Sequence, residues 1–219
     1  MFIFVKKLGE IFLDYTFPQP ASIQKIEKMT AEEYLEKMER CFTELPQCKT
    51  VFRYTDPLAR EAIREVKYRG NKKIAKKFGE ILYTIILDDV EDILSFQNFS
   101  SPLLIPIPSS NKHKKERGFN QTEILAESIM IFDINKIFEY QKHILIKTKN
   151  TIPQTKTKNK SERIKNPVGS FGVKTASRIK GRNIILIDDI VTTGSTLKEA
   201  TKTLKKAGAR KVIAYTIAH

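Results

Sequence analysis

The chain has 219 residues, of which 41% are hydrophobic and 29% are charged, as is typical of a globular protein with one α/β domain or two small ones. Its apolar stretches, such as 81–87 and 184–187, are too short to span a bilayer. Basic residues follow the apolar N-terminus instead of preceding it, so we expect no secretory signal, no membrane span and a cytoplasmic location.

The N-terminal part is predicted to be helical. Residues 3–17 carry apolar side chains at helical spacing, and two prolines follow them. A second helix is predicted over 30–42, because Thr30 with Glu33 three residues later is the capping-box pattern. Residues 50–54 resemble a short strand, and Asp56-Pro57 is a typical start for the next helix.

The two cysteines, Cys41 and Cys48, are too few for a disulfide framework. They are separated by six residues with no histidine nearby, so they cannot supply the four ligands of a structural zinc site. We therefore expect free thiols and no zinc.

The second half of the chain alternates short apolar strands with helices. Predicted strands cover 103–107, 143–146, 184–187 and 212–217, and predicted helices cover about 71–87, 119–131 and 195–207. Strands that are apolar on both faces and joined by helices indicate an α/β fold with a mostly parallel sheet flanked by helices. We expect residues 1–50 to form an N-terminal helical segment and 51–219 to form one domain.

The positive charge is concentrated near the C-terminus. Residues 1–141 contain 21 Lys and Arg against 21 Asp and Glu, whereas 142–182 contain 12 against one, and 183–219 contain six against three. The formal charge of +14 is therefore concentrated in residues 142–219 and not spread evenly over the chain. This concentration predicts an anionic ligand in this part of the molecule.

The most informative segment covers residues 184–196. Four apolar residues form a buried strand, and Asp188 and Asp189 follow at its carboxyl end, where open α/β sheets bind their ligands. A turn of small and hydroxyl residues leads into a helix whose first N–H groups suit a phosphate; these residues are Thr192, Thr193, Gly194, Ser195 and Thr196. No lysine stands in this turn, so it is not a nucleoside-triphosphate loop.

Paired carboxylates beside a phosphate cradle predict a phosphorylated sugar. The alternative is that Asp189 only caps a helix and the turn only connects two elements. The whole segment closely resembles the phosphoribosyl-pyrophosphate (PRPP) fingerprint of type I phosphoribosyltransferases. The resemblance implies that Asp188 and Asp189 bind the ribose 2′- and 3′-hydroxyls, that 192–196 bind the 5′-phosphate, and that Mg²⁺ accompanies PRPP without a direct protein ligand.

The other half of the site is expected after the strand 103–107. A proline-stiffened loop is followed by basic residues and by Gly118-Phe119-Asn120-Gln121, which opens a helix. The predicted pyrophosphate-binding residues are Ser109, Ser110, Lys112, Lys115 and Arg117. An ordinary solvated basic loop is the alternative, since charge runs usually have no specific ligand.

These motifs together resemble the ComF (competence protein F, amidophosphoribosyltransferase-like) family. The marks appear in order over residues 58–219 as 67–70 (KYRG), 105–108 (IPIP), 116–121 (ERGFNQ), Thr151 with Gln154, Arg163 with Asn166, and the Asp-Asp fingerprint. The resemblance implies a type I phosphoribosyltransferase-like domain with an N-terminal helical extension. Two features depart from it. The four-cysteine zinc element of the family is missing, and Thr192 stands where purine-salvage enzymes place an acid.

Residues 147–182 are predicted to form a mobile basic flap over the site. Its cations exceed what PRPP needs, and Lys156, Lys158, Lys160, Arg163 and Lys165 are the predicted nucleic-acid contacts. A solvated lysine-rich surface is the alternative. The family's link to natural transformation implies a PRPP-binding protein that handles single-stranded DNA beside the competence machinery. An active phosphoribosyltransferase with an unidentified amine or base acceptor is the second hypothesis, and the sequence identifies no catalytic residue.

Overall fold

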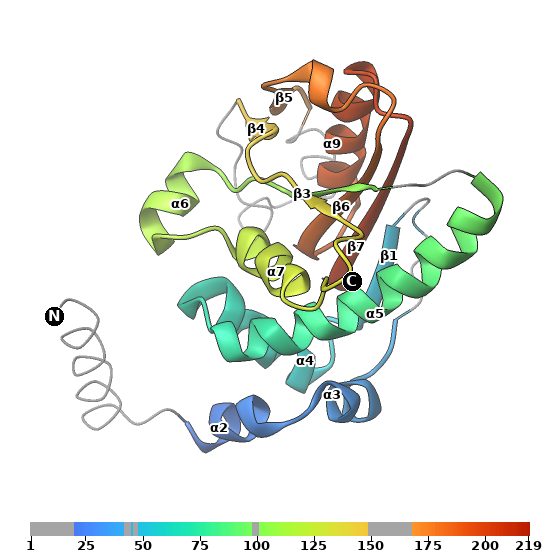
Figure 1. Ribbon diagram of the computed structural model, residues 1–219. Coiled ribbons are helices and arrows are strands. Elements are labelled where there is room, and N and C mark those ends of the chain that lie inside the picture. Colours follow the sequence, from blue (N-terminus) through green and yellow to red (C-terminus); the bar gives the residue numbers. More distant parts are fainter. Residues whose placement is uncertain (1–19, 42–44, 46–47, 98–100, 149–167) are drawn as a thin grey trace, which may run out of the picture.

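The computed structural model describes residues 20–41, 45, 48–97, 101–148 and 168–219, with the side chains of 90–97 and 111–113 excepted. Its centre is a sheet of five strands in the order β1-β7-β6-β2-β3 (Figure 1), and every neighbouring pair is parallel. The strands are β1 (Cys48–Phe52), β2 (Leu103–Pro106), β3 (Glu139–Tyr140), β6 (Asn183–Ile190) and β7 (Lys211–Ala218). This arrangement confirms the predicted fold class.

Helices cover both faces of the sheet. They are α2 (Ala21–Lys28), α3 (Ala31–Lys37), α4 (Pro57–Arg64), α5 (Lys72–Gln97), α6 (Asn111–Arg117), α7 (Gln121–Met130) and α9 (Ser195–Lys206). A π-helical turn, η1 (Glu65–Arg69), continues α4, and a short 3-10 turn, η3 (Ala176–Arg178), precedes β6. Among the described residues, no helix combines the length and the apolar character that crossing a membrane would require.

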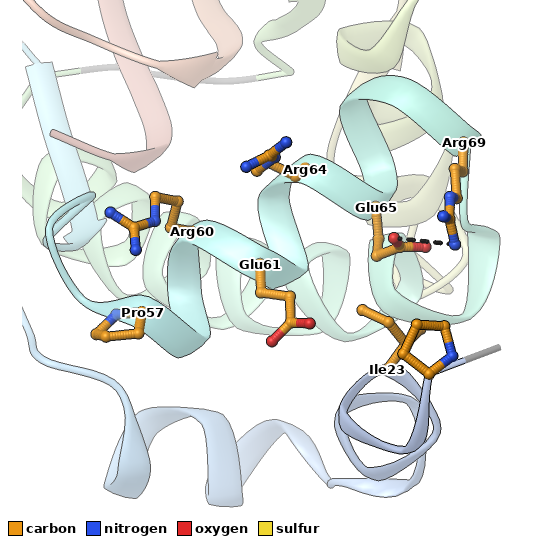
Figure 2. Close-up of a pocket in the computed structure, with 8 residues that line it drawn as sticks. Ile23, Pro57, Arg60, Glu61, Arg64, Glu65 and Arg69 are labelled. Carbon is orange, nitrogen blue, oxygen red and sulfur yellow. Dashed lines mark ion pairs between the residues drawn. The ribbon is translucent and has the colours of Figure 1, made fainter.

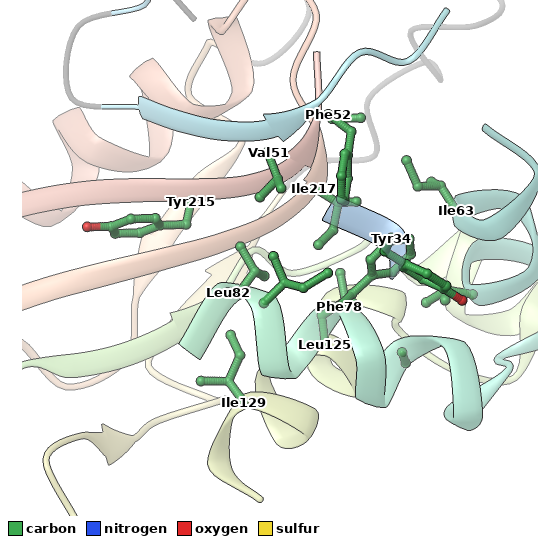
Figure 3. Close-up of a cluster of buried hydrophobic side chains, with 14 of the residues drawn as sticks. Tyr34, Val51, Phe52, Ile63, Phe78, Leu82, Leu125, Ile129, Tyr215 and Ile217 are labelled. Atoms are coloured by element: carbon green, nitrogen blue, oxygen red, sulfur yellow. The ribbon is translucent and has the colours of Figure 1, made fainter. Parts of the chain in front are cut away.

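Alternation along the strands divides the interior into two cores. Ile185 and Ile187 of β6 face one core together with Tyr215 and Ile217 of β7, and helices α2 to α5 and α7 cover it. Figure 3 shows this cluster, in which Phe78 of α5 lies beside Tyr34 and Phe52, with ring centroids 5.6 and 6.3 Å away. Leu186 of β6 and Ala214 of β7 point to the opposite face of the sheet, where they belong to a second core that α9 covers. Strands that are buried on both faces explain the continuous apolar runs of the sequence.

Several predicted elements agree with the structure, and others differ from it. Thr30 caps α3 through the expected reciprocal bonds with Glu33, although the helix ends at Lys37 and not near residue 42. The strand predicted at 143–146 is β4 (Leu145–Lys147), and it does not join the parallel sheet. It pairs antiparallel with β5 (Phe171–Val173), which no sequence pattern indicated. The helix predicted at 3–17 lies outside the described residues.

Candidate functional site

The carboxyl ends of β2 and β6 lie side by side and bring the two predicted half-sites together. Pro106 pairs with Ile187, and the Ile107 N–H donates to the Ile187 carbonyl at 2.9 Å. Ser109 and Ser110 therefore leave β2 at the same sheet edge where β6 presents its two aspartates. The Ser109 hydroxyl is buried without a hydrogen-bond partner among the described residues, so it has unused capacity for a ligand.

The two aspartates are largely enclosed by the protein. Asp188 is 8% exposed and Asp189 is 6% exposed, and both belong to β6 itself. The Asp189 carboxylate forms an ion pair with Lys67 of η1, whose Nζ is 3.2 Å from Oδ2. The Asp188 Oδ1 accepts a hydrogen bond from the Asp189 N–H at 2.9 Å, so the pair is also tied to its own backbone. A ligand that binds Asp189 must share this carboxylate with Lys67 or displace the lysine.

The two carboxyl groups differ in their electrostatic environment. Burial and the neighbouring Asp189 carboxylate raise the pKa of Asp188 well above its usual value. Burial also acts to raise the pKa of Asp189, but the Lys67 ammonium and hydrogen bonds outweigh it, so that pKa is lowered. Asp189 therefore holds the negative charge of the pair more firmly, and Asp188 takes up a proton more readily.

The turn after β6 leads directly into α9. Gly194 has φ +70, a left-handed conformation that favours glycine, and an added Cβ would lie 3.1 Å from Leu45. The Thr193 and Ser195 hydroxyls are 2.8 Å apart, and the His219 ring nitrogen Nε2 is 3.1 Å from the Thr192 carbonyl. Thr192 is exposed, and Thr193 and Gly194 are half-buried, so the turn is open to solvent at the N-terminus of a twelve-residue helix.

Comparison with known proteins shows which sequences this chain is similar to. Residues 123–219 match the family model described as a phosphoribosyl transferase domain. Competence protein ComFC of Bacillus subtilis is 34% identical over 174 residues, which are 79% of this chain and 64% of that protein. Competence protein F of Haemophilus influenzae is 26% identical over 75% of this chain and 69% of its own length. DNA utilization protein YhgH of Escherichia coli is 25% identical over 79% of this chain and 73% of its own length.

Over most of its length the chain is similar to proteins of the ComF family. The match leaves about a third of the Bacillus subtilis relative uncovered, since it spans 64% of that protein. The family model begins at residue 123, so it includes the aspartates and the turn before α9 but not Lys67 or the loop after β2.

The basic segment of this ComF-type chain after β2 forms a helix, not a loop. It is α6, and the next helix, α7, is capped by Asn120, whose side chain accepts from the Thr122 N–H and donates to the Ile107 carbonyl at 3.2 Å. Asn120 thus fixes the direction in which the chain leaves β2. The Arg117 guanidinium lies over the Tyr68 ring, 5.0 Å from its centroid, and donates to Gln121. Lys115 is exposed, and the side chain of Lys112 lies outside the described residues.

Two lysines beside the aspartates were not assigned to the site from the sequence. Lys67 lies in the 67–70 motif, which carried no predicted role, and its pairing with Asp189 joins η1 to β6. Lys147, at the end of β4, lies close enough to Asp188 to be affected by its carboxylate. Burial lowers the pKa of Lys147, and the Asp188 carboxylate offsets part of that effect. The predicted flap contacts Lys156, Lys158, Lys160, Arg163 and Lys165 lie outside the described residues.

A hollow of about 410 Å³ lies apart from the aspartates, between α2 and the α4–η1 segment (Figure 2). Its arginines are interspersed with acids. Glu65 pairs with Arg69 at 3.4 Å, and Glu61 accepts a hydrogen bond from Ser22 at 2.8 Å. Because its charges are mixed, this hollow offers no clear preference for one class of ligand.

Proposed function

We propose that this chain binds PRPP and acts in DNA uptake, handling single-stranded DNA in the cytoplasm beside the competence machinery. One observation carries the PRPP assignment: two buried carboxylates and the open turn before α9 meet at one sheet edge. Parallel α/β sheets bind ligands at this edge. Carboxylates accept sugar hydroxyls, and helix N-termini with hydroxyl side chains bind phosphate.

In this assignment Asp188 and Asp189 accept the ribose 2′- and 3′-hydroxyls, and residues 192–196 hold the 5′-phosphate. The pyrophosphate takes the side of the site formed by the loop after β2 and α6, with Ser109, Ser110, Lys112, Lys115 and Arg117. Lys67 neutralises Asp189 while the site is empty. When the ribose binds, Asp189 shares its carboxylate between the ribose hydroxyl and the Lys67 ammonium, which keeps the buried charge compensated.

Magnesium would enter together with PRPP. The described residues contain no group of three or more His, Cys, Asp or Glu side chains able to hold a metal ion. Two carboxylates at the ribose position nevertheless suit a magnesium ion that takes most of its ligands from PRPP oxygens and water. Bound there, the ion would neutralise pyrophosphate charge, while Asp188 and Asp189 orient the sugar beneath it.

The DNA part of the proposal rests on charge and on the relatives. Residues 142–182 carry 12 basic residues and one acid, far more than one PRPP molecule requires. The similar proteins bear the names competence protein and DNA utilization protein. If about six cations contact phosphates, log K for single-stranded DNA falls with log salt at a slope of about −4. Charge reversal at Lys156, Lys158 and Lys160 should weaken DNA binding more than PRPP binding.

The second candidate is an active phosphoribosyltransferase. The aspartate pair and the turn before α9 favour it, because they are the parts that bind PRPP in such enzymes. Thr192, which replaces the acid of the purine-salvage enzymes, argues against a 6-oxopurine acceptor, since a threonine hydroxyl is no base near neutral pH. An amine or another base is the acceptor class that remains.

One experiment separates the two candidates. The protein is incubated with PRPP, Mg²⁺ and a panel of bases and amines, and pyrophosphate release is measured alongside the binding of a labelled single-stranded oligonucleotide. Salt-sensitive DNA binding without acceptor-dependent release supports the first candidate, and release supports the second. Calorimetry with the double variant Asp188→Asn, Asp189→Asn tests the shared site: unchanged PRPP affinity would refute it.

A further inference from the structure

A second hollow, at the outer end of the β4–β5 pair, is lined by basic side chains. It has a volume of about 380 Å³ and is formed by Tyr140, Gln141, Lys142, His143, Ile144, Lys174, Thr175 and Arg178. Three of these residues are Lys or Arg and one is His, and this lining includes no Asp or Glu. It therefore differs from the hollow beside α4, where acids and arginines alternate.

Two chain segments build this hollow from opposite sides. Residues 140–144 enter β4, and 174–178 leave β5, and the Lys174 N–H donates to the Ile144 carbonyl at 3.0 Å. Arg178 lies on η3 and donates to the Gln141 side chain at 3.3 Å, which orients its guanidinium across the gap between the segments. Basic side chains thus converge through tertiary structure and not through one run of sequence.

Acids near the hollow compensate its charge only in part. Glu139 pairs with Arg182 at 2.8 Å, outside the lining, and its carboxylate also attracts Arg178. Glu127 reaches Lys142 at 3.5 Å, but both side chains are about half exposed, so this contact is weak. Among the described residues, Lys174 has no ion-pair partner, and His143, Lys174 and Arg178 are all exposed. The hollow therefore presents donors and positive charge to any ligand.

We propose that this hollow binds backbone phosphates of single-stranded DNA, as a site separate from the PRPP-binding edge. The inference rests on the proposed DNA-handling function and gives it a location in the described part of the chain. An open hollow lined by exposed cations suits phosphates that are contacted from outside, whereas a small anion held alone requires enclosing donors. We expect this contact to be independent of base sequence, because the cationic side chains of the hollow would contact the phosphates and not the edges of the bases.

The position of the hollow connects it to the rest of the basic field. Lys142 and Lys174 lie at one end of the β4–β5 pair, and Lys147 with Phe171 lies at the other, next to Asp188. Three residues of strand separate these ends, or about 10 Å. A strand of DNA seated in the hollow can therefore continue along the pair toward Lys147.

The test compares the double variant Lys174→Gln, Arg178→Gln with the control Lys25→Gln, Lys28→Gln. The control makes the same charge change on α2, at the far end of the molecule from β5 (Figure 1). Anisotropy of a labelled oligothymidylate is measured across a series of NaCl concentrations. We expect the slope of log K against log salt to become shallower by about 1.4 in the double variant, from about 0.7 per lost contact, and to stay unchanged in the control.

Each outcome discriminates between explanations. If wild type binds the oligonucleotide and both variants lose the same amount, net charge and not the hollow is responsible, and the inference is wrong while the DNA proposal stands. If wild type does not bind at all, both are wrong. If the Lys174→Gln, Arg178→Gln variant loses binding of inorganic pyrophosphate but keeps the wild-type binding of oligothymidylate, the ligand of the hollow is a small anion. The inference is then again wrong. PRPP affinity should remain at the wild-type value in both variants.

Discussion

Asp188 and Asp189 are neighbours in sequence, yet the structure gives them opposite electrostatic roles. Asp189 has a cation at 3.2 Å, whereas Asp188 has burial and a like charge beside it. Because its pKa is lowered, Asp189 stabilises the fold at pH values above the usual pKa of Asp. This stabilisation is lost as the pH falls through the lowered pKa. A raised pKa costs stability as pH rises above the usual value. The two side chains should therefore respond differently to the same substitution.

We expect Asp188→Asn to raise the melting temperature at pH 8, because it removes a buried charge, and the gain should shrink as pH falls toward 4. Asp189→Asn should lower stability, because Lys67 loses its partner. Breaking a buried ion pair costs about 3–5 kcal/mol. This is an upper limit here, since the Lys67 side chain is 20% exposed and Asp188 is close enough to share it. Thermal unfolding across this pH range measures both effects, and a matching response of the two variants would contradict the assignment.

Removing Lys67 should make ligand binding depend on pH. In Lys67→Met, Asp189 keeps its burial but loses the cation that lowers its pKa, so its carboxylate takes up protons at a higher pH than in wild type. PRPP affinity should then fall between pH 8 and pH 6 more steeply than in wild type. Lys67→Arg keeps the charge and serves as the control. Parallel calorimetric pH profiles for Met and wild type would show that Lys67 does not tune Asp189.

The sequence predicts which residues gather at the strand end but not how their charges are balanced. Strand, acid pair, small-residue turn and helix are contiguous in sequence, so local patterns indicate them. Lys67 reaches Asp189 only because η1 packs beside β6, and no local pattern contains that contact. The burial of the two carboxylates likewise depends on elements distant in sequence, so no local pattern could indicate it.

At the level of elements, the η1 turn and its terminal glycine hold Lys67 in position. Gly70 ends η1 with φ +63, and an added Cβ would lie 3.1 Å from the Phe119 ring. Gly181 has φ +73 and nothing within 4 Å of its Cβ position, so it isolates the backbone cost. An alanine at Gly181 would incur only the cost of the left-handed backbone, about 1–2 kcal/mol. An alanine at Gly70 would add the cost of a steric contact between two ComF-type motifs.

We expect Gly181→Ala to lower the free energy of unfolding by about 1 kcal/mol and Gly70→Ala to lower it more. Only Gly70→Ala should also weaken PRPP binding, because the contact with Phe119 moves the turn that carries Lys67. Urea unfolding and calorimetry measure the two quantities. Equal losses of stability would mean that Phe119 moves aside without cost, and the link between the motifs would then have no energetic role.

The bounds of some elements were predicted well and those of others were not. Helices α7 and α9 lie close to their predicted ranges, and the capping box of α3 was identified from two residues, but α5 extends ten residues beyond its predicted end and β6 extends beyond 184–187 in both directions. By contrast, β4 and β5 have three residues each, and β5 contains Gly172 within a basic polar stretch. Three residues carry too little alternation to define a strand or its partner, so the antiparallel pair could not be inferred. The π-helical turn has no recognised sequence pattern either.

At the level of the whole molecule, the helices before β1 share the main core with the sheet. Tyr34 of α3 is fully buried, its hydroxyl donates to the Ile26 carbonyl at 2.9 Å, and its ring packs on Phe78. The Cys41 N–H donates to Val51 at 3.0 Å, which ties the segment to β1. The division between residues 1–50 and 51–219 remains a prediction, and its meaning for folding can be tested directly.

We expect a chain of residues 51–219 to unfold at a lower urea concentration than the full chain and to bind an apolar dye. The truncation removes Tyr34 and Ile26 from the core, and it takes three residues of β1 away from their partners in β7, leaving apolar surface and strand groups exposed. Losing a buried aromatic side chain alone costs about 3–5 kcal/mol, comparable to the stability of a small domain. A truncated chain with an unchanged midpoint and no dye binding would mean that residues 51–219 fold without the first 50, and the shared core would then contribute little to holding the PRPP-binding edge in place.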